Sequence, residues 1–408
     1  MGGFAEKLQG KRESQHPQLP HATVEILNKD SNVARVVLAM SGGVDSSVAA
    51  HLLVEAGHEV TGVFMRHGEQ AVTACAIDGT RESSPLLPVL NQRADHKQGC
   101  CSALDAEDGR RVAERLGIPF YALNLESEFR QIIDYFVDEY TRGRTPNPCV
   151  QCNNWIKFGK LFDYADSIGA EYVATGHYAQ LIKYGEQNLP AIIRGVDASK
   201  DQSYVLFGIQ RHFLKRMLLP VGGFQKSNIR EIAGQLGLNV ADKKDSQEIC
   251  FVTSGHHGEF VRNRQDGIDT SGNFITSDGT IVGQHNGIET FTIGQRKGLG
   301  IALGEPHFVI KIDVETHDVV LGKKSELGRR ELTASETNWL NDPESNESEP
   351  FRCQAQIRYN SAAAPATAWR AGGSLKVLFD EPQDGVAPGQ AVVCYDDNRV
   401  LGGGWIDS

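Results

Sequence analysis

The chain has 408 residues, of which 40% are hydrophobic and 23% are charged, and this balance is typical of a globular protein. It excludes a disordered chain, a collagen-like repeat and a coiled coil, and the length predicts two or three domains. The formal net charge of -11 argues mildly against a general nucleic-acid binder. Eight cysteines are too few for a disulfide scaffold, so we expect them to be buried, metal-bound or catalytic.

We do not expect the N-terminal part of the chain to be a secretory leader. Residues 1–33 are polar and mixed in charge, which predicts a disordered extension and not a secretory leader. No apolar run approaches the roughly 20 residues that cross a bilayer. We therefore expect a cytoplasmic protein that has no membrane partner and is a monomer.

Short apolar strands alternate with helices in the first half of the chain. The predicted strands are 35–40, 59–65, 118–124 and 171–175, and the predicted helices are 45–56, 105–116, 156–168 and 227–236. Each of these helices is followed by a glycine, as expected where the backbone turns left-handed, and Ser227 takes the N-cap position of the last one. A further helix is expected to begin near Asp201. This alternation predicts a doubly wound parallel α/β sheet.

From about residue 267 the sequence changes to short strands with frequent glycine. The predicted strands are 308–313, 319–321, 351–357, 375–379 and 391–395. They predict an all-β unit, a small barrel or sandwich. We divide the chain into the extension 1–33, an ATP-binding catalytic domain 34–252, a small central linker domain 253–305 and a β-barrel domain 306–408. The polar stretch 66–98 is expected to be a surface loop.

A loop rich in glycine and serine joins the first predicted strand to the first predicted helix. It reads Ser-Gly-Gly-Val-Asp-Ser-Ser from Ser41. Gly42 and Gly43 let backbone N–H groups approach an anion, the serines offer hydroxyls, and the helix N-terminus adds a positive dipole end. No Gly-Lys-Ser/Thr follows, so this is not a Walker A loop, and the alternative is a plain turn with a serine cap. With Asp45 inside it, the loop resembles the pyrophosphate-binding loop of the ATP pyrophosphatase superfamily.

Three cysteines stand out. Cys149 and Cys152 lie in the stretch Asn-Pro-Cys-Val-Gln-Cys that begins at Asn147. Cys152 precedes a predicted helix whose dipole would stabilise a thiolate. By themselves the two are also compatible with half a zinc site, a redox pair, an iron–sulfur ligand set or buried thiols. Cys250 lies between Ile249 and Phe251, which by itself favours a core position over catalysis.

In combination and in this order, the motifs resemble the tRNA-specific 2-thiouridylases, from about Val36 to the C-terminus. Besides the loop and the cysteines, the resemblance is carried by Gly176-His177-Tyr178, Lys200-Asp201-Gln202, the run Gly294 to Gly300, Gln356-Ile357-Arg358-Tyr359, the run Pro388 to Val392 and the run Leu401 to Ile406. The resemblance implies a PP-loop ATP pyrophosphatase domain, a small central domain and a C-terminal barrel that contacts tRNA.

The resemblance also implies an activity, that of a tRNA-uridine 2-sulfurtransferase. ATP, expected with magnesium, would adenylate the C2 oxygen of the uridine at the first anticodon position. Sulfur delivered as a persulfide would then replace that oxygen and give 2-thiouridine. The implied partners are tRNA and a sulfur-donor protein, either a cysteine desulfurase or a sulfur-relay protein.

Roles for single residues follow from the same resemblance. Cys250 would carry the persulfide, and Cys152 would be the nucleophile that resolves it and leaves a disulfide. The expected ATP-binding residues are Ala39, Met40, Ser41, Gly42, Gly43, Val44, Asp45, Ser46, Met65 and Gly176. The expected tRNA-binding residues are Asn147, Pro148, Cys149, His177, Lys200, Asp201, Gln202, Arg358, Tyr359 and Gln390. No metal site is expected. Because Cys149 stands where some relatives have Asp, an iron–sulfur cluster on the three cysteines is an alternative, although not the favoured one.

Two other functions fit part of the sequence. An amidating ligase similar to NAD synthetase would use the same loop, but it would need ammonia and no paired cysteines. A tRNA-binding or sulfur-carrying module without chemistry of its own would not need the intact loop. Basic residues outnumber acidic ones by seven to two in 205–244, which predicts a local tRNA surface there, together with Arg296, Lys297 and Arg358.

Overall fold

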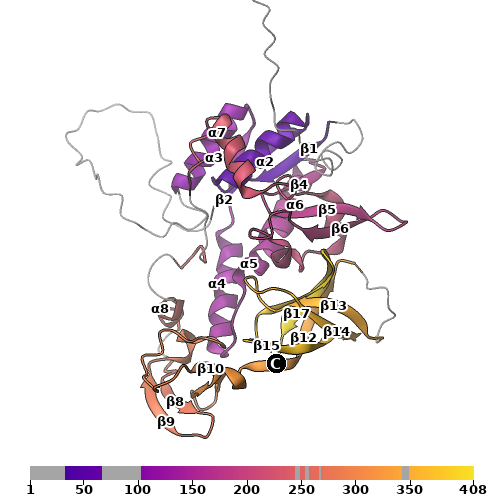
Figure 1. Ribbon diagram of the computed structural model, residues 1–408. Helices are drawn as coiled ribbons and strands as arrows, with labels where there is room; N and C mark the ends of the chain where they lie inside the picture. The colour runs from indigo at the N-terminus through magenta and orange to yellow at the C-terminus, as the bar shows by residue number, and fades with distance from the viewer. Residues whose placement is uncertain (1–32, 67–102, 244–248, 253–256, 266–267, 342–348) are drawn as a thin grey trace, which may run out of the picture.

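The computed structural model describes residues 33–66, 103–243, 249–252, 257–265, 268–341 and 349–408 (Figure 1). The predictions for the N-terminal extension and for nearly all of the stretch 66–98 lie outside these residues, as do Cys75, Cys100 and Cys101. No helix in the described part of the chain is long and apolar enough to span a membrane.

The N-terminal domain is built on a parallel sheet whose strand order is β3-β2-β1-β4-β7. Its strands are β1 (Arg35–Ala39), β2 (Glu59–Arg66), β3 (Phe120–Asn124), β4 (Tyr172–Ala174) and β7 (Met217–Leu218). The chain proceeds from β1 to one edge and then returns to the other side of β1, so the strand order reverses between β1 and β4. Ligands of such sheets bind outside the carboxyl ends of the strands at this point. The predicted doubly wound sheet is confirmed.

Helices cover both faces of this sheet. On one face lie α2 (Val44–Glu55), α3 (Ala103–Leu116) and α7 (Lys226–Gln235), and on the other lie α4 (Glu126–Thr141) and α6 (Leu161–Ser167). Successive side chains of a strand point to opposite faces. Val36 and Leu38 of β1 therefore pack against the first group of helices, while Val37 and Ala39 pack against the second.

Two helices on the second face differ from the expectation. The helix expected over 156–168 begins earlier: α5 (Pro148–Gln151) leads into η2, a π-helix over Cys152–Lys160, and then into α6. Helix α4 was not expected at all, although its buried residues Phe129, Ile132, Phe136 and Tyr140 recur at helical spacing. Figure 1 shows α4 in the middle of the molecule, between the three units of the fold.

Two predictions about helix starts are wrong. Helix α7 has Gln225, not Ser227, at its N-cap position. The backbone N–H of Lys226 instead donates to Asp197 Oδ2 at 3.0 Å, so the capping acceptor comes from a distant part of the chain. The helix expected from about Asp201 is only a short 3-10 helix, η3 (Ser203–Leu206).

A four-stranded sheet of order β10-β11-β8-β9 forms the central unit. Its strands are β8 (Gly272–Thr276), β9 (Ile281–His285), β10 (Phe308–Ile312) and β11 (Val319–Gly322). Phe274, Phe291 and Val309 belong to its separate core. Because β11 pairs with β8, the domain boundary predicted between 305 and 306 falls inside this sheet.

The C-terminal unit is a closed β-barrel. Its strands are β12 (Gly328–Trp339), β13 (Phe351–Gln356), β14 (Ala364–Ala371), β15 (Ser374–Asp384), β16 (Ala391–Asp396) and β17 (Arg399–Ile406). They follow the order β12-β15-β14-β13-β16-β17, and pairing between β12 and β17 closes the barrel. The barrel continues into the hairpin of β5 (Ala179–Tyr184) and β6 (Leu189–Arg194), because β6 pairs with β17. The sequence therefore predicted the barrel correctly, but not that a hairpin of the N-terminal domain extends it.

Candidate functional site

The loop between β1 and α2 is fixed by its own side chains. The Ser46 hydroxyl accepts a hydrogen bond from the backbone N–H of Ser41 and donates one to the Gly43 carbonyl, both at 3.2 Å. The Ser47 hydroxyl donates to the same carbonyl at 2.8 Å. Gly42 has a φ of 69°, and a Cβ there would lie 2.0 Å from the carbonyl oxygen of Asp105. The turn is therefore preformed at a helix N-terminus, as anion binding requires.

Gly176 completes the turn from the neighbouring strand. It follows β4, which lies beside β1 at the point where the strand order reverses. A Cβ at this position would come within 2.8 Å of the Ser46 backbone nitrogen. The side chains of Met40 and Met65 are buried in the cores on opposite faces of the sheet. Gly176 thus lies directly against the predicted ATP loop. The two methionines pack in the cores on either side of the sheet that carries the loop.

Asp45 is held from two sides. Both of its carboxylate oxygens accept hydrogen bonds from Lys226 Nζ at 2.8 Å, and Oδ1 also accepts one from the Tyr178 hydroxyl at 2.6 Å. Lys226 is 8% exposed, so its charge is placed at the loop and not on an open surface.

A second lysine lies at the other side of the loop. Lys243 Nζ donates to the Gly42 carbonyl at 2.9 Å, to Asp105 at 2.6 Å and to Asp108 at 2.7 Å. Burial lowers the pKa of Lys243, but the hydrogen bonds to the two carboxylates outweigh it and raise the pKa above its usual value. The ammonium group therefore stays charged beside the loop.

Several basic residues of the stretch 205–244 have hydrogen-bond partners within the domain. Lys226 and Lys243 bond to the loop and its carboxylates, and Arg230 donates to the carbonyls of Ala241 and Lys243. Lys226 is buried, and Arg230 and Lys243 are half-buried. All three side chains have hydrogen-bond partners within the domain, and the tRNA surface that the residue count predicted stays a prediction. The sequence did not indicate the role of Lys226 and Lys243 at the loop, because more than 180 residues separate them from it.

The predicted cysteine loop lies at the start of the π-helix. Asn147 Oδ1 caps α5 by accepting a hydrogen bond from the backbone N–H of Val150 at 3.3 Å. Cys149 is exposed, and Cys152 begins η2 in a half-buried position. Short π-helical segments occur frequently at functional sites.

Cys250 lies beside the same hydrophobic core as Cys152, although about a hundred residues separate them. Its neighbour Phe251 anchors the segment by packing edge-on against Phe136 of α4, with 5.2 Å between ring centroids. No disulfide joins any of the cysteines that the structure describes. Within the described ranges, no group of three or more His, Cys, Asp or Glu side chains is arranged to hold a metal ion.

Several residues predicted to bind tRNA have internal partners. The Asp201 carboxylate accepts hydrogen bonds from Arg194 at 2.7 Å and from the backbone N–H of Gly195 at 2.9 Å. The Gln202 side chain accepts one from the backbone N–H of Tyr178 at 2.9 Å. Gln202 therefore helps to hold Tyr178, whose hydroxyl bonds to Asp45, whereas Asp201 holds the end of β6.

The barrel brings exposed residues to the cysteine loop. Arg358 and Tyr359 follow β13 and are exposed, and Arg358 donates to the Asp384 carbonyl at 2.8 Å. Burial raises the pKa of Tyr359, and the nearby Asp201 and Cys149 raise it further. Tyr359 of the barrel thus interacts electrostatically with residues of the N-terminal domain, and its ring lies 6.4 Å from that of Tyr204.

His177 is buried beside Phe158 of η2, with 6.2 Å between ring centroids, and should make the fold sensitive to acid. Its Nδ1 lies 2.7 Å from the Thr175 hydroxyl, and burial, followed by the charge of Lys157, holds its pKa well below the usual 6.5. Below about pH 6.5 the unfolded chain therefore binds a proton on His177, whereas the folded protein does not. The contribution of neutral His177 to the free energy of unfolding is fully present above about pH 6.5. As the pH falls below that value, the free energy of unfolding decreases by up to about 1.4 kcal/mol per pH unit.

Unfolding at pH 7 and at pH 5 tests this expectation. A His177→Gln variant should lose less stability between the two values than the wild type does, whereas replacing the exposed His212 by Gln should leave the difference unchanged. Equal losses in the wild type and in His177→Gln would contradict the expectation.

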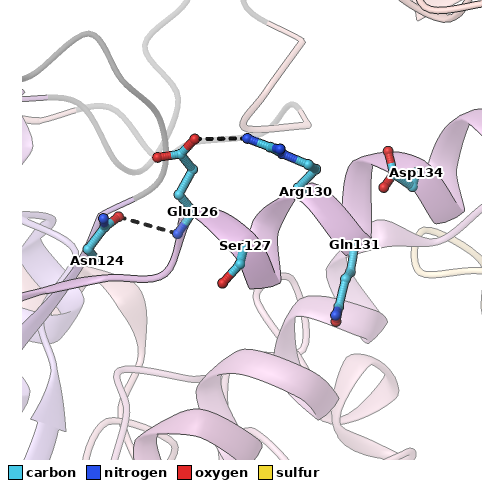
Figure 2. A pocket seen from close by; sticks show the side chains of 6 residues that line it. All are labelled: Asn124, Glu126, Ser127, Arg130, Gln131 and Asp134. Carbon is cyan, nitrogen blue, oxygen red and sulfur yellow. Dashed lines mark hydrogen bonds and ion pairs between the residues drawn. The ribbon is translucent and has the colours of Figure 1, made fainter.

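A polar pocket of about 370 Å³ lies where β3 meets α4 (Figure 2). It is lined by Asn124, Glu126, Ser127, Arg130, Gln131 and Asp134. Glu126 pairs with Arg130 at 3.0 Å across its rim. None of the residues predicted for ATP, tRNA or sulfur lines this pocket, so it is separate from the candidate site.

Comparison with known protein families divides the chain into the same three units as the structure does. A family model described as tRNA methyl transferase HUP domain matches residues 34–254, one described as tRNA methyl transferase PRC-barrel domain matches 259–323, and one described as Aminomethyltransferase beta-barrel domain matches 329–406. These segments contain the parallel sheet, the central four-stranded sheet and the closed barrel.

Full-length relatives are more specific. A tRNA-specific 2-thiouridylase MnmA from Rhodopirellula baltica is 57% identical over 387 residues, which cover 92% of this chain and 96% of the relative. The chain belongs to the tRNA-specific 2-thiouridylase family. Relatives of the same name from Carboxydothermus hydrogenoformans and Clostridium acetobutylicum are 46% and 44% identical over 375 residues, with 91% of this chain and 97% and 99% of the relatives covered. The resemblance stated from the 2-thiouridylase motifs is confirmed.

Proposed function

We propose that this protein forms 2-thiouridine in tRNA, by adenylating the C2 oxygen of the uridine at the first anticodon position and replacing it with sulfur. The observation that carries the proposal is 57% identity, over nearly the whole chain, to a protein named tRNA-specific 2-thiouridylase. A preformed anion-binding turn and two half-buried cysteines in the same domain support it.

Adenylation is the step assigned to the loop. The C2 oxygen of uridine is a poor leaving group; when it attacks the α-phosphorus of ATP, pyrophosphate departs and the oxygen becomes part of AMP. Backbone N–H groups at the start of α2, with Lys226 and Lys243 beside them, suit the charge of the phosphates. Magnesium usually accompanies ATP and takes oxygen ligands. Asp45 is the carboxylate inside the loop and would be the residue that holds magnesium there.

Sulfur transfer is the step assigned to the cysteines. A sulfur-donor protein loads Cys250 as a persulfide, whose terminal sulfur attacks C2 and expels AMP. The Cys152 thiolate then attacks the Cys250 sulfur and breaks the S–S bond, so that the terminal sulfur stays on C2 as the thiocarbonyl. This leaves a disulfide between Cys152 and Cys250, which a thiol reductant reopens by supplying two electrons.

One measurement separates this proposal from the two alternatives. Purified protein should convert ATP to AMP and pyrophosphate only when tRNA is added, because the tRNA oxygen is the acceptor. Conversion that needs ammonia and no tRNA would favour an amidating ligase. No conversion with any tRNA, in the presence of a persulfide donor, would favour a binding or sulfur-carrying module and would contradict the proposed adenylation.

A further inference from the structure

We infer that the C-terminal barrel positions the cysteine loop through Gln390, so that this side chain is a positioning residue for the chemistry. The inference rests on the proposed function for its consequence in catalysis. Its structural content stands on contacts between the segment that precedes Cys149 and the start of β16, and it is testable without tRNA.

The side chain of Gln390 is bonded to the loop backbone. Its Nε2 donates hydrogen bonds to the carbonyls of Thr145 at 3.2 Å and of Pro146 at 3.0 Å. The backbone continues the contact, because the N–H of Thr145 donates to the carbonyl of Pro388 at 2.7 Å. Three hydrogen bonds therefore join two segments that are about 245 residues apart in the sequence.

The fit around Gln390 is close. Its neighbour Gly389 has a φ of 87°, and a Cβ there would come within 2.8 Å of Glu139 Oε2 and 2.9 Å of the Thr145 carbonyl oxygen. Arg144 bridges the same two parts: its Nε donates to Glu139 at 2.8 Å, and its Nη2 donates to the Ile406 carbonyl at 3.4 Å. The loop is thus held against one end of the barrel, at the start of β16 and the adjacent end of β17.

A shift at residues 145 and 146 would be passed on to the cysteines. Pro146 and Pro148 restrict the backbone on either side of Asn147, which caps the short helix that carries Cys149. The backbone N–H of Asn147 donates to the Tyr135 hydroxyl at 3.3 Å, so the far side of the loop is fixed to α4. The barrel and α4 therefore hold the loop between them, and Gln390 is the side chain through which the barrel contributes.

This role differs from direct recognition of tRNA, which the resemblance implies for Gln390. The Thr145 and Pro146 carbonyls need donors, because a backbone acceptor shielded from water without a partner costs free energy. Removing the Gln390 donors should loosen the loop even when no tRNA is present. A residue that only touches tRNA would have no effect on the tRNA-free protein.

Two variants of the full-length protein test the inference, and each is compared with the wild type and with a matched control. Gln390→Ala removes the donors, and the isosteric Gln390→Glu turns a carboxylate toward two carbonyl oxygens. The control is Gln383→Glu, because Gln383 lies on β15 of the same barrel and donates to the Glu381 carbonyl. The first measurement is the rate at which Cys152 is alkylated in tRNA-free protein, followed by mass spectrometry. The second compares the change in kcat with the change in the Kd for tRNA.

We expect Cys152 to be alkylated about ten-fold faster in Gln390→Ala, and faster still in Gln390→Glu, because the loop opens more often. In both variants kcat should fall, while the Kd for tRNA stays within about two-fold and the Gln383→Glu control matches the wild type. An unchanged alkylation rate overturns the inference, whether the Kd for tRNA rises or not. If wild-type protein forms no 2-thiouridine, the proposed function fails, whereas the alkylation result still decides the positioning of the loop.

Discussion

Replacing Cys250 by serine should abolish the protein-bound persulfide and leave tRNA-dependent release of pyrophosphate intact. A hydroxyl cannot hold sulfane sulfur, whereas in the proposed mechanism adenylation takes place at the loop after β1 and does not use this side chain. Peptide mapping by mass spectrometry after incubation with a persulfide donor, together with a pyrophosphate assay, measures both parts. Cys353→Ala, which alters a thiol in the barrel core, is the control and should keep both.

The partner variant Cys152→Ser should accept sulfur on Cys250 and then stop, because no thiolate remains to break the persulfide bond. Wild-type protein assayed without reductant should accumulate a disulfide between Cys152 and Cys250 after one turnover. Sulfane sulfur found on Cys149 or Cys101 would contradict the assignment. So would an anaerobically prepared sample that carries a cluster on Cys149, Cys152 and Cys250.

Replacing Gly176 by alanine should lower tRNA-dependent formation of AMP by about a hundred-fold or more. The new Cβ would stand 2.8 Å from the Ser46 nitrogen and 2.9 Å from the Asp45 carbonyl carbon, so the turn or β4 must shift. A displacement of about 1 Å at a reacting group can lower the rate of a reaction by about a hundred-fold.

The control for this experiment is Gly234→Ala. Gly234 lies in α7, no atom stands within 4 Å of a Cβ added there, and alanine should stabilise the helix by about 1 kcal/mol. Both variants are assayed for pyrophosphate release and for thermal unfolding. Wild-type turnover in Gly176→Ala would show that the loop between β1 and α2 is not the site of adenylation.

The parts of the fold that the sequence predicted are those with a local cause. The continuous apolar run of β1, the glycines after the helices and the short strands of the barrel all leave compositional or conformational signals within a few residues. Helix α4 carried such a signal as well, since Phe129, Ile132 and Phe136 are spaced for one face, and reading that spacing would have found it.

The parts that it did not predict depend on contacts between distant segments. Asp197 caps α7 across 29 residues, Lys226 reaches Asp45 across 181, and Gln390 reaches Pro146 across 244. No local pattern indicates such pairs. The resemblance implies contact with tRNA for Asp201 and Gln202, and the structure adds internal partners that no motif indicates: Asp201 accepts a hydrogen bond from the backbone N–H of Gly195, and Gln202 accepts one from that of Tyr178.

Nucleoside analysis of tRNA from cells that lack this protein is the most direct measurement of its activity. The account predicts that 2-thiouridine and its derivatives disappear from the first anticodon position. The wild-type gene should restore them, and a gene encoding Cys250→Ser should not. Unchanged 2-thiouridine, or the loss of a methylated nucleoside in its place, would contradict the account.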